Sequence, residues 1–68
     1  MARVTDQQIL DFIDLYHEKH GYAPSMRDVM VGVGLVSVGA IRYRMGILKE
    51  KGLVSFEPGQ ARTLKVVH

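Results

Sequence analysis

The chain has 68 residues, of which 47% are hydrophobic and 24% are charged, and these are ordinary values for a folded globular domain. A chain of this length buries only about 60% of the surface that it exposes when unfolded, so we expect one small core. It contains no cysteine, which excludes disulfide bonds and thiolate metal sites. The sequence shows neither a run of roughly 18 apolar residues nor a secretion signal, so we expect a cytoplasmic protein without membrane contacts.

Positive charge is concentrated in the second half of the sequence, although the whole chain carries a net charge of only +2 and has a pI near 9.2. Residues 1–34 hold three basic and five acidic residues, whereas residues 35–68 hold six basic and two acidic ones. The two halves therefore have net charges of −2 and +4. This asymmetry favours an anionic partner that is bound by one face of the protein, and nucleic acid is the first candidate.

The first predicted helix covers residues 6–20. Thr5 is followed three residues later by Gln8, which is the spacing of a capping box at the start of a helix. Gly21 is expected to end the helix in the left-handed conformation. The helix is amphipathic, because acidic residues share one side while apolar and aromatic residues recur on the other with the helical period. This apolar stripe consists of Ile9, Phe12, Ile13, Tyr16 and His20.

The second predicted helix covers residues 26–33, with Ser25 as its N-cap and Gly34 as its end. Gly32 weakens this prediction, because glycine inside a helix costs roughly 1 kcal/mol relative to alanine. The prediction is supported by apolar residues at positions i, i+3, i+4 and i+7. These residues are Met26, Val29, Met30 and Val33.

The third predicted helix starts after the N-cap Ser37, runs to Lys51 and ends at Gly52. Its core stripe consists of Ile41, Met45 and Leu48. About three residues that include the Gly34 stop separate it from the second helix, and such a short connection turns the chain sharply. The two helices are therefore expected to form a helix-turn-helix.

The pattern changes after Gly52 to two segments rich in strand-forming residues, 53–56 and 62–67. Pro58 and Gly59 lie between them and are typical of a type II turn. We therefore expect an antiparallel hairpin, which must share the helical core because two strands alone are marginally stable in water. The predicted fold is α+β: one winged helix-turn-helix domain over residues 1–68, with three helices and a two-stranded C-terminal wing.

In a winged helix-turn-helix the third helix can enter a major groove about 12 Å wide, and the wing lies on the adjacent backbone or minor groove. Arginine binds guanine O6 and N7, tyrosine contacts a thymine methyl group or a phosphate, and glycine allows close approach of the backbone. Ser37 and the free amides behind it offer a phosphate site. The outward arc of the third helix carries Gly39, Arg42, Tyr43 and Gly46, and it is flanked by Arg44, Lys49 and Lys51.

Several short motifs occur in order along nearly the whole chain. They are Thr5-x-x-Gln8, Gly21-Tyr22-Ala23-Pro24-Ser25-x-Arg27-Asp28-Val29, Val33-Gly34-Leu35-x-Ser37, Ile41 through Leu48, Lys51-Gly52-Leu53-Val54, and Arg62. In this order they resemble the DNA-binding domain of LexA-type repressors. The resemblance implies a winged helix-turn-helix that reads double-stranded DNA through its third helix, as a sequence-specific transcriptional regulator of repressor type.

The resemblance also extends the set of candidate contacts. Arg27, Ser37 and Arg62 match the family pattern, and the family uses the third helix and the wing to contact DNA. The residues at the reading positions, including Arg42 and Tyr43, differ from those of the repressors, so the target sequence cannot be carried over. The expected DNA-binding residues are Arg27, Ser37, Gly39, Ala40, Arg42, Tyr43, Arg44, Gly46, Lys49, Gln60 and Arg62.

LexA-type repressors also carry a C-terminal domain that dimerises and cleaves its own chain, and no such segment precedes the end of this sequence at His68. We therefore expect no self-cleavage, and a small regulator, of phage or mobile-element origin, or an excised domain. Because one winged domain covers one half-site, useful affinity is expected to need a homodimer or a fused partner protein. Such a protein would be associated with the nucleoid.

Other function classes have weaker support in the sequence. A protein-binding module, for example a phage-encoded inhibitor of a host protein, is the alternative, and it would use apolar residues such as Val31 and Ile47. The sequence contains no recognisable catalytic constellation, so we expect no enzymatic activity, cofactor or small-molecule substrate. A metal site is also not expected, although four residues on the first helix have suitable spacing. They are Asp11, Asp14, His17 and Glu18.

Overall fold

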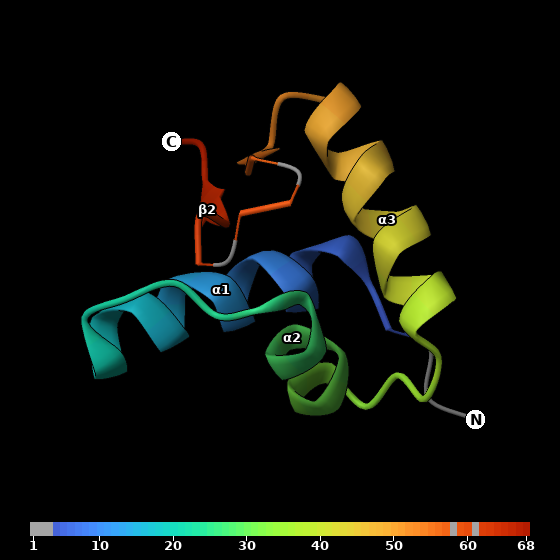
Figure 1. Cartoon of the computed structure of the whole chain (residues 1–68), viewed down its shortest axis with the longest axis horizontal. Coiled ribbons are helices and arrows are strands. Elements are labelled where there is room, and N and C mark those ends of the chain that lie inside the picture. The colour runs from blue at the N-terminus through green and yellow to red at the C-terminus, as the bar shows by residue number, and fades with distance from the viewer. Residues whose placement is uncertain (1–3, 58, 61) are drawn as a thin grey trace.

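Three helices precede a short antiparallel hairpin in the computed structural model, which describes residues 4–57, 59–60 and 62–68. The helices are α1 (Asp6–His20), α2 (Met26–Val33) and α3 (Val38–Glu50), and the strands are β1 (Val54–Ser55) and β2 (Lys65–Val66). Figure 1 shows α3 standing steeply against α1, with the hairpin and α2 on either side of α1. The predicted α+β fold of three helices and a hairpin is confirmed.

Side-chain caps fix the starts of all three helices where they were expected. The Thr5 hydroxyl accepts a hydrogen bond from the Gln8 backbone N–H (3.1 Å), and the Gln8 side chain accepts one from the Thr5 N–H (2.8 Å). Ser25 and Asp28 form a second reciprocal pair at the start of α2, with both distances 3.0 Å. The Ser37 hydroxyl accepts from the Ala40 N–H (3.3 Å). Each cap satisfies amides that have no partner within the helix.

The turn between α2 and α3 has helix-turn-helix geometry. Gly34 ends α2 with a φ of +85°, a left-handed conformation that suits glycine, and the Leu35 N–H donates to the Met30 carbonyl at 2.9 Å. The axes of the two helices are bent by 105°, within the 90–120° range of this motif. At the other end, α3 stops at Glu50, one residue before the predicted end, and Lys51 is its C-cap.

The core is formed by residues from every element. The buried apolar residues of α1 and α3 belong to the stripes that the helical period predicted, and α2 contributes Val29. Phe12 and Tyr16 are only half-buried, and His20 is exposed and stacks on the Tyr16 ring with centroids 4.2 Å apart. The packed cluster consists of Ile9, Ile13, Val29, Ile41, Met45, Leu48, Val54 and Leu64.

The hairpin has shorter strands than predicted, with only two residues in each. Val54 pairs with Val66, and Ser55 pairs with Lys65. It is held to the helices by Val54 and Leu64 in the core and by a hydrogen bond between His17 Nε2 and the Leu64 carbonyl (3.0 Å). The predicted Pro58-Gly59 turn falls partly on a residue outside the described ones, while Gly59 itself has a φ of +78°. The hairpin is therefore held mainly by the packing of Val54 and Leu64 and by the hydrogen bond to His17, because the ladder between its strands is short.

No single helix in the described part of the chain is long and apolar enough to cross a membrane. Only α2 and α3 together, across their bend, meet the criterion of length and composition.

Candidate nucleic-acid interface

The outer face of α3 points away from the body of the molecule. Arg42 and Tyr43 are exposed, with 71% of Tyr43 accessible, while Ile41 and Met45 beside them are fully buried. Neither Arg42 nor Tyr43 forms a hydrogen bond or ion pair with residues 4–57, 59–60 or 62–68. Gly39 and Gly46 lie on the same exposed arc. The predicted orientation of α3 is confirmed.

Two of the cations expected to flank this face point towards α1 instead. Arg44 Nη2 donates to Asp6 Oδ1 at 3.0 Å, and Lys51 Nζ lies 3.6 Å from Asp6 Oδ2. The hydrogen bond from Arg44 is the main cause that lowers the pKa of Asp6 below its ordinary value. Only 27% of the Arg44 side chain is exposed. Arg44 is therefore engaged by the carboxylate at the start of α1, and its expected contact with DNA stays a prediction.

Lys49 lies where α3 meets the wing. Its ammonium group donates to the Phe56 carbonyl (3.1 Å) and lies 4.6 Å from the centre of the Phe56 ring. The residue is exposed, so its charge remains open to solvent next to the first strand of the hairpin. This places one positive charge at the junction of α3 and the wing.

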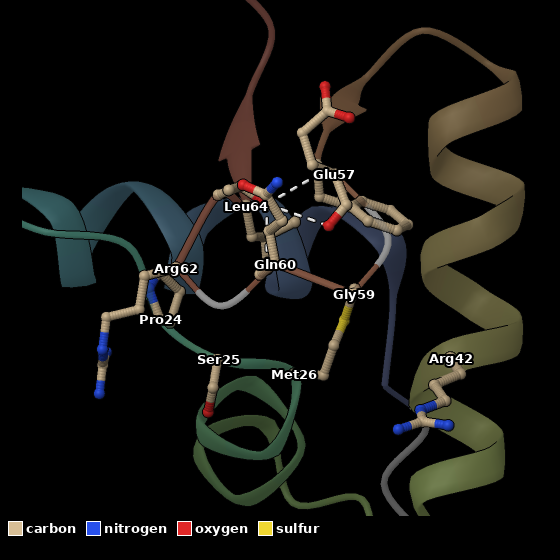
Figure 2. A pocket seen from close by; sticks show the side chains of 11 residues that line it. Pro24, Ser25, Met26, Arg42, Glu57, Gly59, Gln60, Arg62 and Leu64 are labelled. Carbon is tan, nitrogen blue, oxygen red and sulfur yellow. Dashed lines mark hydrogen bonds between the residues drawn. The ribbon is translucent and has the colours of Figure 1, made fainter.

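A hollow of about 440 Å³ separates α3 from the wing and the start of α2. Its apolar lining includes Pro24, Met26 and Phe56, and its wing side includes Glu57, Gln60 and Arg62. Figure 2 shows Arg42 pointing from α3 towards this hollow. Inside the wing, Thr63 Oγ1 accepts a hydrogen bond from the Glu57 N–H (2.8 Å), and the same hydroxyl donates to the Gln60 carbonyl (3.2 Å).

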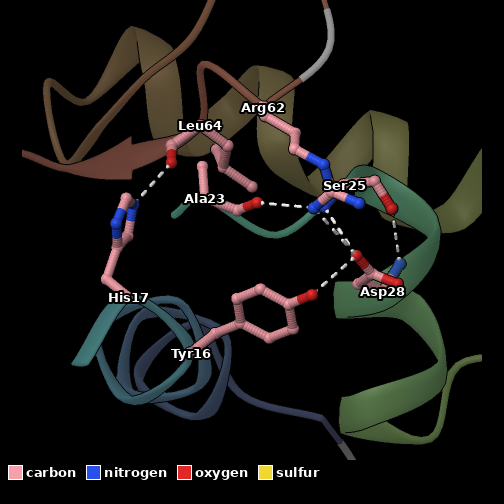
Figure 3. Close-up of polar contacts among 7 residues, drawn as sticks. All are labelled: Tyr16, His17, Ala23, Ser25, Asp28, Arg62 and Leu64. Carbon is pink, nitrogen blue, oxygen red and sulfur yellow. Dashed lines mark hydrogen bonds and ion pairs between the residues drawn. The ribbon is translucent and has the colours of Figure 1, made fainter. Parts of the chain in front are cut away.

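Arg62 lies in the wing but is engaged within the molecule. Its Nη1 donates to the Ala23 carbonyl (3.0 Å) and lies 3.8 Å from Asp28 Oδ2. Its guanidinium carbon lies 4.8 Å from the centre of the Tyr22 ring. Figure 3 shows Arg62 of the wing reaching Ala23 before α2 and Asp28 in the first turn of α2. The guanidinium group expected to contact a phosphate is thus engaged within the molecule, while 49% of the side chain is exposed, and its contact with DNA stays a prediction.

The remaining expected contacts lie on the first turns of α2 and α3. Arg27 is exposed on α2, and Ser37 is exposed at the cap of α3. Ala40 is half-buried, because the helix turns it partly towards the body of the molecule. With Arg42, Tyr43 and the two glycines, these residues surround the beginning and middle of α3, and their contacts with DNA stay predictions.

Comparison with known proteins agrees with this geometry. Residues 1–63 match the family model described as the LexA DNA binding domain. The chain belongs to this family. The LexA repressor of Acetivibrio thermocellus is 37% identical over 62 residues, which cover 91% of the chain and 29% of that protein. The LexA repressors of Bacillus mycoides and Bacillus cereus are each 36% identical over 69 residues, which cover 98% of the chain and 34% of those proteins.

The chain thus spans about a third of the length of the curated LexA repressors that it matches. The resemblance found in the sequence motifs is confirmed by the family match. What the sequence did not reveal in this LexA-family domain is the cluster of Tyr16, Tyr22 and Asp28 around Arg62. The Ser25-x-x-Asp28 spacing of a capping box was the one signal that could have indicated a role for Asp28.

The structure also shows where the residues lie that the sequence offered for a metal site or for a protein contact. Among the described residues, no group of three or more histidine, aspartate and glutamate side chains could hold a metal ion. His17 instead binds the Leu64 carbonyl, and Asp14 pairs with His68 at 3.1 Å. Of the two apolar residues considered for a protein contact, Val31 is exposed and Ile47 is half-buried.

Proposed function

We propose that residues 1–68 form one DNA-binding domain that binds double-stranded DNA with sequence preference and acts as a transcriptional repressor. In this proposal α3 lies in the major groove and the wing lies on the adjacent backbone or minor groove. The observation that carries it is the outer face of α3, where Arg42 and Tyr43 are exposed without partners among the described residues. The family match supports the same conclusion.

The hollow between α3 and the wing suits the path of one DNA strand. Arg42 lines one side of it, and Gln60 lines the other. When α3 occupies the major groove and the wing reaches the next groove, the backbone between the grooves passes through the space that separates them. We propose that this hollow receives the sugar-phosphate backbone.

Within this arrangement the residues have different roles. Arg42 and Tyr43 contact base edges, because they are the two large side chains at the centre of the outer face. Gly39, Ala40 and Gly46 allow the helix to approach the bases closely. The proposed backbone contacts are Arg27, Ser37, Lys49 and Gln60. Arg44 and Arg62 are left out of the contact set because both are engaged within the molecule.

We further propose that the domain is not catalytic, that it works at the nucleoid, and that two domains act together. A single winged domain covers one half-site, so a homodimer or a fused partner supplies the second half-site.

The experiment that tests the DNA-binding proposal is selection of bound duplexes from a random pool, repeated at two salt concentrations. Bound sequences are expected to share a motif, because base contacts specify a site while phosphate contacts do not. The affinity for the selected duplex should fall with salt, with a slope of log K against log salt concentration of about −0.9 for each phosphate neutralised. If a folded chain retards no duplex at low salt, the proposal is wrong.

Protein binding is a second candidate function, supported by a surface that α1 and α2 form. A hollow of about 310 Å³ between α1 and α2 is lined by Phe12, Leu15 and Val33, and Leu15 is 61% exposed. Val31 is also 68% exposed. A function of this kind would not depend on Arg42, so a purified partner that binds the parent chain and the Arg42→Ala variant equally would favour it.

A further inference from the structure

Arg62 has an unusual backbone conformation for its position between the turn of the wing and β2. Its φ is +61°, and it is the non-glycine residue with a positive φ among those that the structure describes. Residues with a Cβ atom adopt this left-handed conformation infrequently, so its surroundings must hold it there. The conformation directs the side chain away from the hairpin and across to the segment that precedes α2.

The Arg62 side chain makes three contacts of different kinds with residues 22–28, which comprise the end of that segment and the first turn of α2. It donates a hydrogen bond to the Ala23 carbonyl, pairs with the Asp28 carboxylate, and stacks over the Tyr22 ring. Guanidinium suits such a combination, because its planar fork of donors can bind oxygen atoms while its face lies on an aromatic ring. One wing residue is therefore bound at three points to a segment 34 to 40 positions earlier in the sequence.

Asp28 links these contacts to the rest of the fold. Its carboxylate accepts hydrogen bonds from the Ser25 N–H (3.0 Å) and the Tyr16 hydroxyl (3.3 Å) while it faces Arg62. The hydrogen bond from the Ser25 backbone is the main cause that lowers the pKa of Asp28, so the carboxylate is charged at neutral pH. As Figure 3 shows, α1, the start of α2 and the wing meet at this one carboxylate.

The hairpin needs such a tie because its own ladder is short. Two residue pairs, Val54 with Val66 and Ser55 with Lys65, cannot fix the direction of the turn beyond them. The hydroxyl of Thr63 sets the internal shape of the turn, since its partners Glu57 and Gln60 belong to the same turn. Lys49 and His17 bind the backbone at the two ends of the turn, at Phe56 and Leu64, and Arg62 adds a contact from within the wing to the start of α2.

We propose that Arg62 is a positioning residue that holds the turn of the wing against the segment before α2 and the first turn of α2, through Tyr22, Ala23 and Asp28. In this proposal its guanidinium group, although it borders the hollow, does not contact a phosphate. The proposal rests on the proposed DNA binding for its functional consequence. The contacts of Arg62 with Tyr22, Ala23 and Asp28 are themselves present in the protein without DNA. In this proposal these contacts keep the wing side of the hollow, with Gln60, in a fixed position.

The test compares Arg62→Lys, Arg62→Gln and Tyr22→Leu in the full chain, with Lys65→Gln as a control for the loss of one exposed wing-strand charge. Affinity for the selected duplex is measured over a series of salt concentrations. We expect Arg62→Gln and Tyr22→Leu each to weaken binding about tenfold, and the double variant to be no weaker than either single one. Arg62→Lys should not restore affinity, because an ammonium keeps the charge but lacks the planar fork.

A phosphate contact at Arg62 would give a different pattern. The salt slope would fall by about 0.9 in Arg62→Gln, Arg62→Lys would retain most of the affinity, and Tyr22→Leu would be silent. Any of these results would overturn the proposal. Lys65→Gln is expected to change affinity less than twofold, since its side chain is exposed on β2 and lies outside the proposed contact set.

A second measurement needs no DNA and separates the two proposals. Amide hydrogen exchange and backbone resonances of Glu57 and Gln60, whose N–H groups donate to Thr63 Oγ1 and to the Glu57 carbonyl, are recorded in the free protein. Exchange at these amides should become faster in Arg62→Gln and Tyr22→Leu, while the amides of α3 keep their protection. Unchanged wing amides in both variants would overturn the positioning role, even if DNA binding is intact. If the wing amides exchange faster in the variants but the parent chain binds no duplex, the positioning role of Arg62 stands and the proposed function is wrong.

Discussion

The outer face of α3 and the Arg62 cluster are both rich in polar side chains, but they are built in opposite ways. On α3, Arg42 and Tyr43 are exposed and have no polar partner among the described residues. Under the wing, Arg62, Asp28 and Tyr16 bind one another and the caps and loop around them. The first surface is open to a partner, whereas the second is satisfied within the molecule.

This difference shows that the number of cations in a segment does not determine how many can bind an anion. The second half of the chain carries a net charge of +4, yet Arg44, Lys51 and Arg62 each face a carboxylate from the acidic first half. Part of the asymmetry in the sequence is therefore used to join the two halves. The remainder is concentrated near α3, where Arg42 and Lys49 lie.

The largest effect on DNA binding is expected on the outer face of α3, which is open to a partner, and not at the Arg62 cluster, whose polar groups bind one another. Arg42→Ala should cost about 1–3 kcal/mol of binding free energy on the selected duplex and relax the preference at one base position, because one bidentate base contact is lost. The free energy of unfolding should not change, since Arg42 has no partner in the described part of the chain. Binding titrations on selected and random duplexes, with Lys19→Ala on α1 as the control, measure both. Equal losses on the two duplexes would contradict a base contact.

Two glycines allow a comparison between a position that packs against another side chain and a position that is open. A Cβ atom at Gly32 in α2 would overlap the Phe12 ring, whereas one at Gly46 on α3 would have open space among the described residues. Gly32→Ala is expected to destabilise the protein, because overpacking costs about 1–3 kcal/mol and outweighs the gain in helix propensity. Gly46→Ala should instead stabilise it by about 0.5–1 kcal/mol. Urea unfolding of both variants checks this, and a stabilised Gly32→Ala would show that Phe12 moves aside freely.

Low pH should first destabilise the two regions in which the carboxylates of Asp6 and Asp28 are paired. The pKa values of Asp6 and Asp28 lie below the ordinary 3.8, mainly because of hydrogen bonds from Arg44 and from the Ser25 backbone. Both carboxyls bind protons more weakly in the folded state than in the unfolded one, so their contribution to stability is complete above pH 3.8 and is lost as the pH falls through the lowered values. Urea unfolding from neutral to acid pH should show this loss. Its steepness should decrease in Asp6→Asn and in Asp28→Asn, and an unchanged profile in both would contradict it.

The smallest effect is expected at Arg44, which sequence reasoning placed beside the reading face. Because it pairs with Asp6 at 3.0 Å, Arg44→Gln should cost about 0.2–1 kcal/mol of stability, as partly exposed ion pairs do. DNA affinity should change less than twofold if its charge is directed to α1. A loss as large as that of Arg42→Ala would place Arg44 on the DNA after all. Fluorescence anisotropy measures the DNA affinity and an unfolding curve measures the stability, and together they distinguish these two outcomes.

The fold could be predicted from the sequence because its decisive signals are local. The caps Thr5, Ser25 and Ser37 gave the helix starts, and the helical period gave the core stripes of α1 and α3. The outward position of Arg42 followed from the same period. The partners of Arg44 and Arg62 could not be predicted, because they lie 38 and 39 positions away and are met only through tertiary packing. Strand length was also overestimated, since β-propensity continues beyond the residues that pair.

The two-pair ladder of the hairpin also makes the wing a place where the protein can be redesigned. Glu57, Gly59 and Gln60 lie between anchored ends, with Val54 and Leu64 in the core and Arg62 bound to the Ala23 carbonyl. Lengthening a flexible loop costs little, about 0.6 kcal/mol for each doubling of its length. Grafting a longer or differently charged loop there, with Arg62 and Thr63 retained, offers a route to new target preferences without repacking the interior.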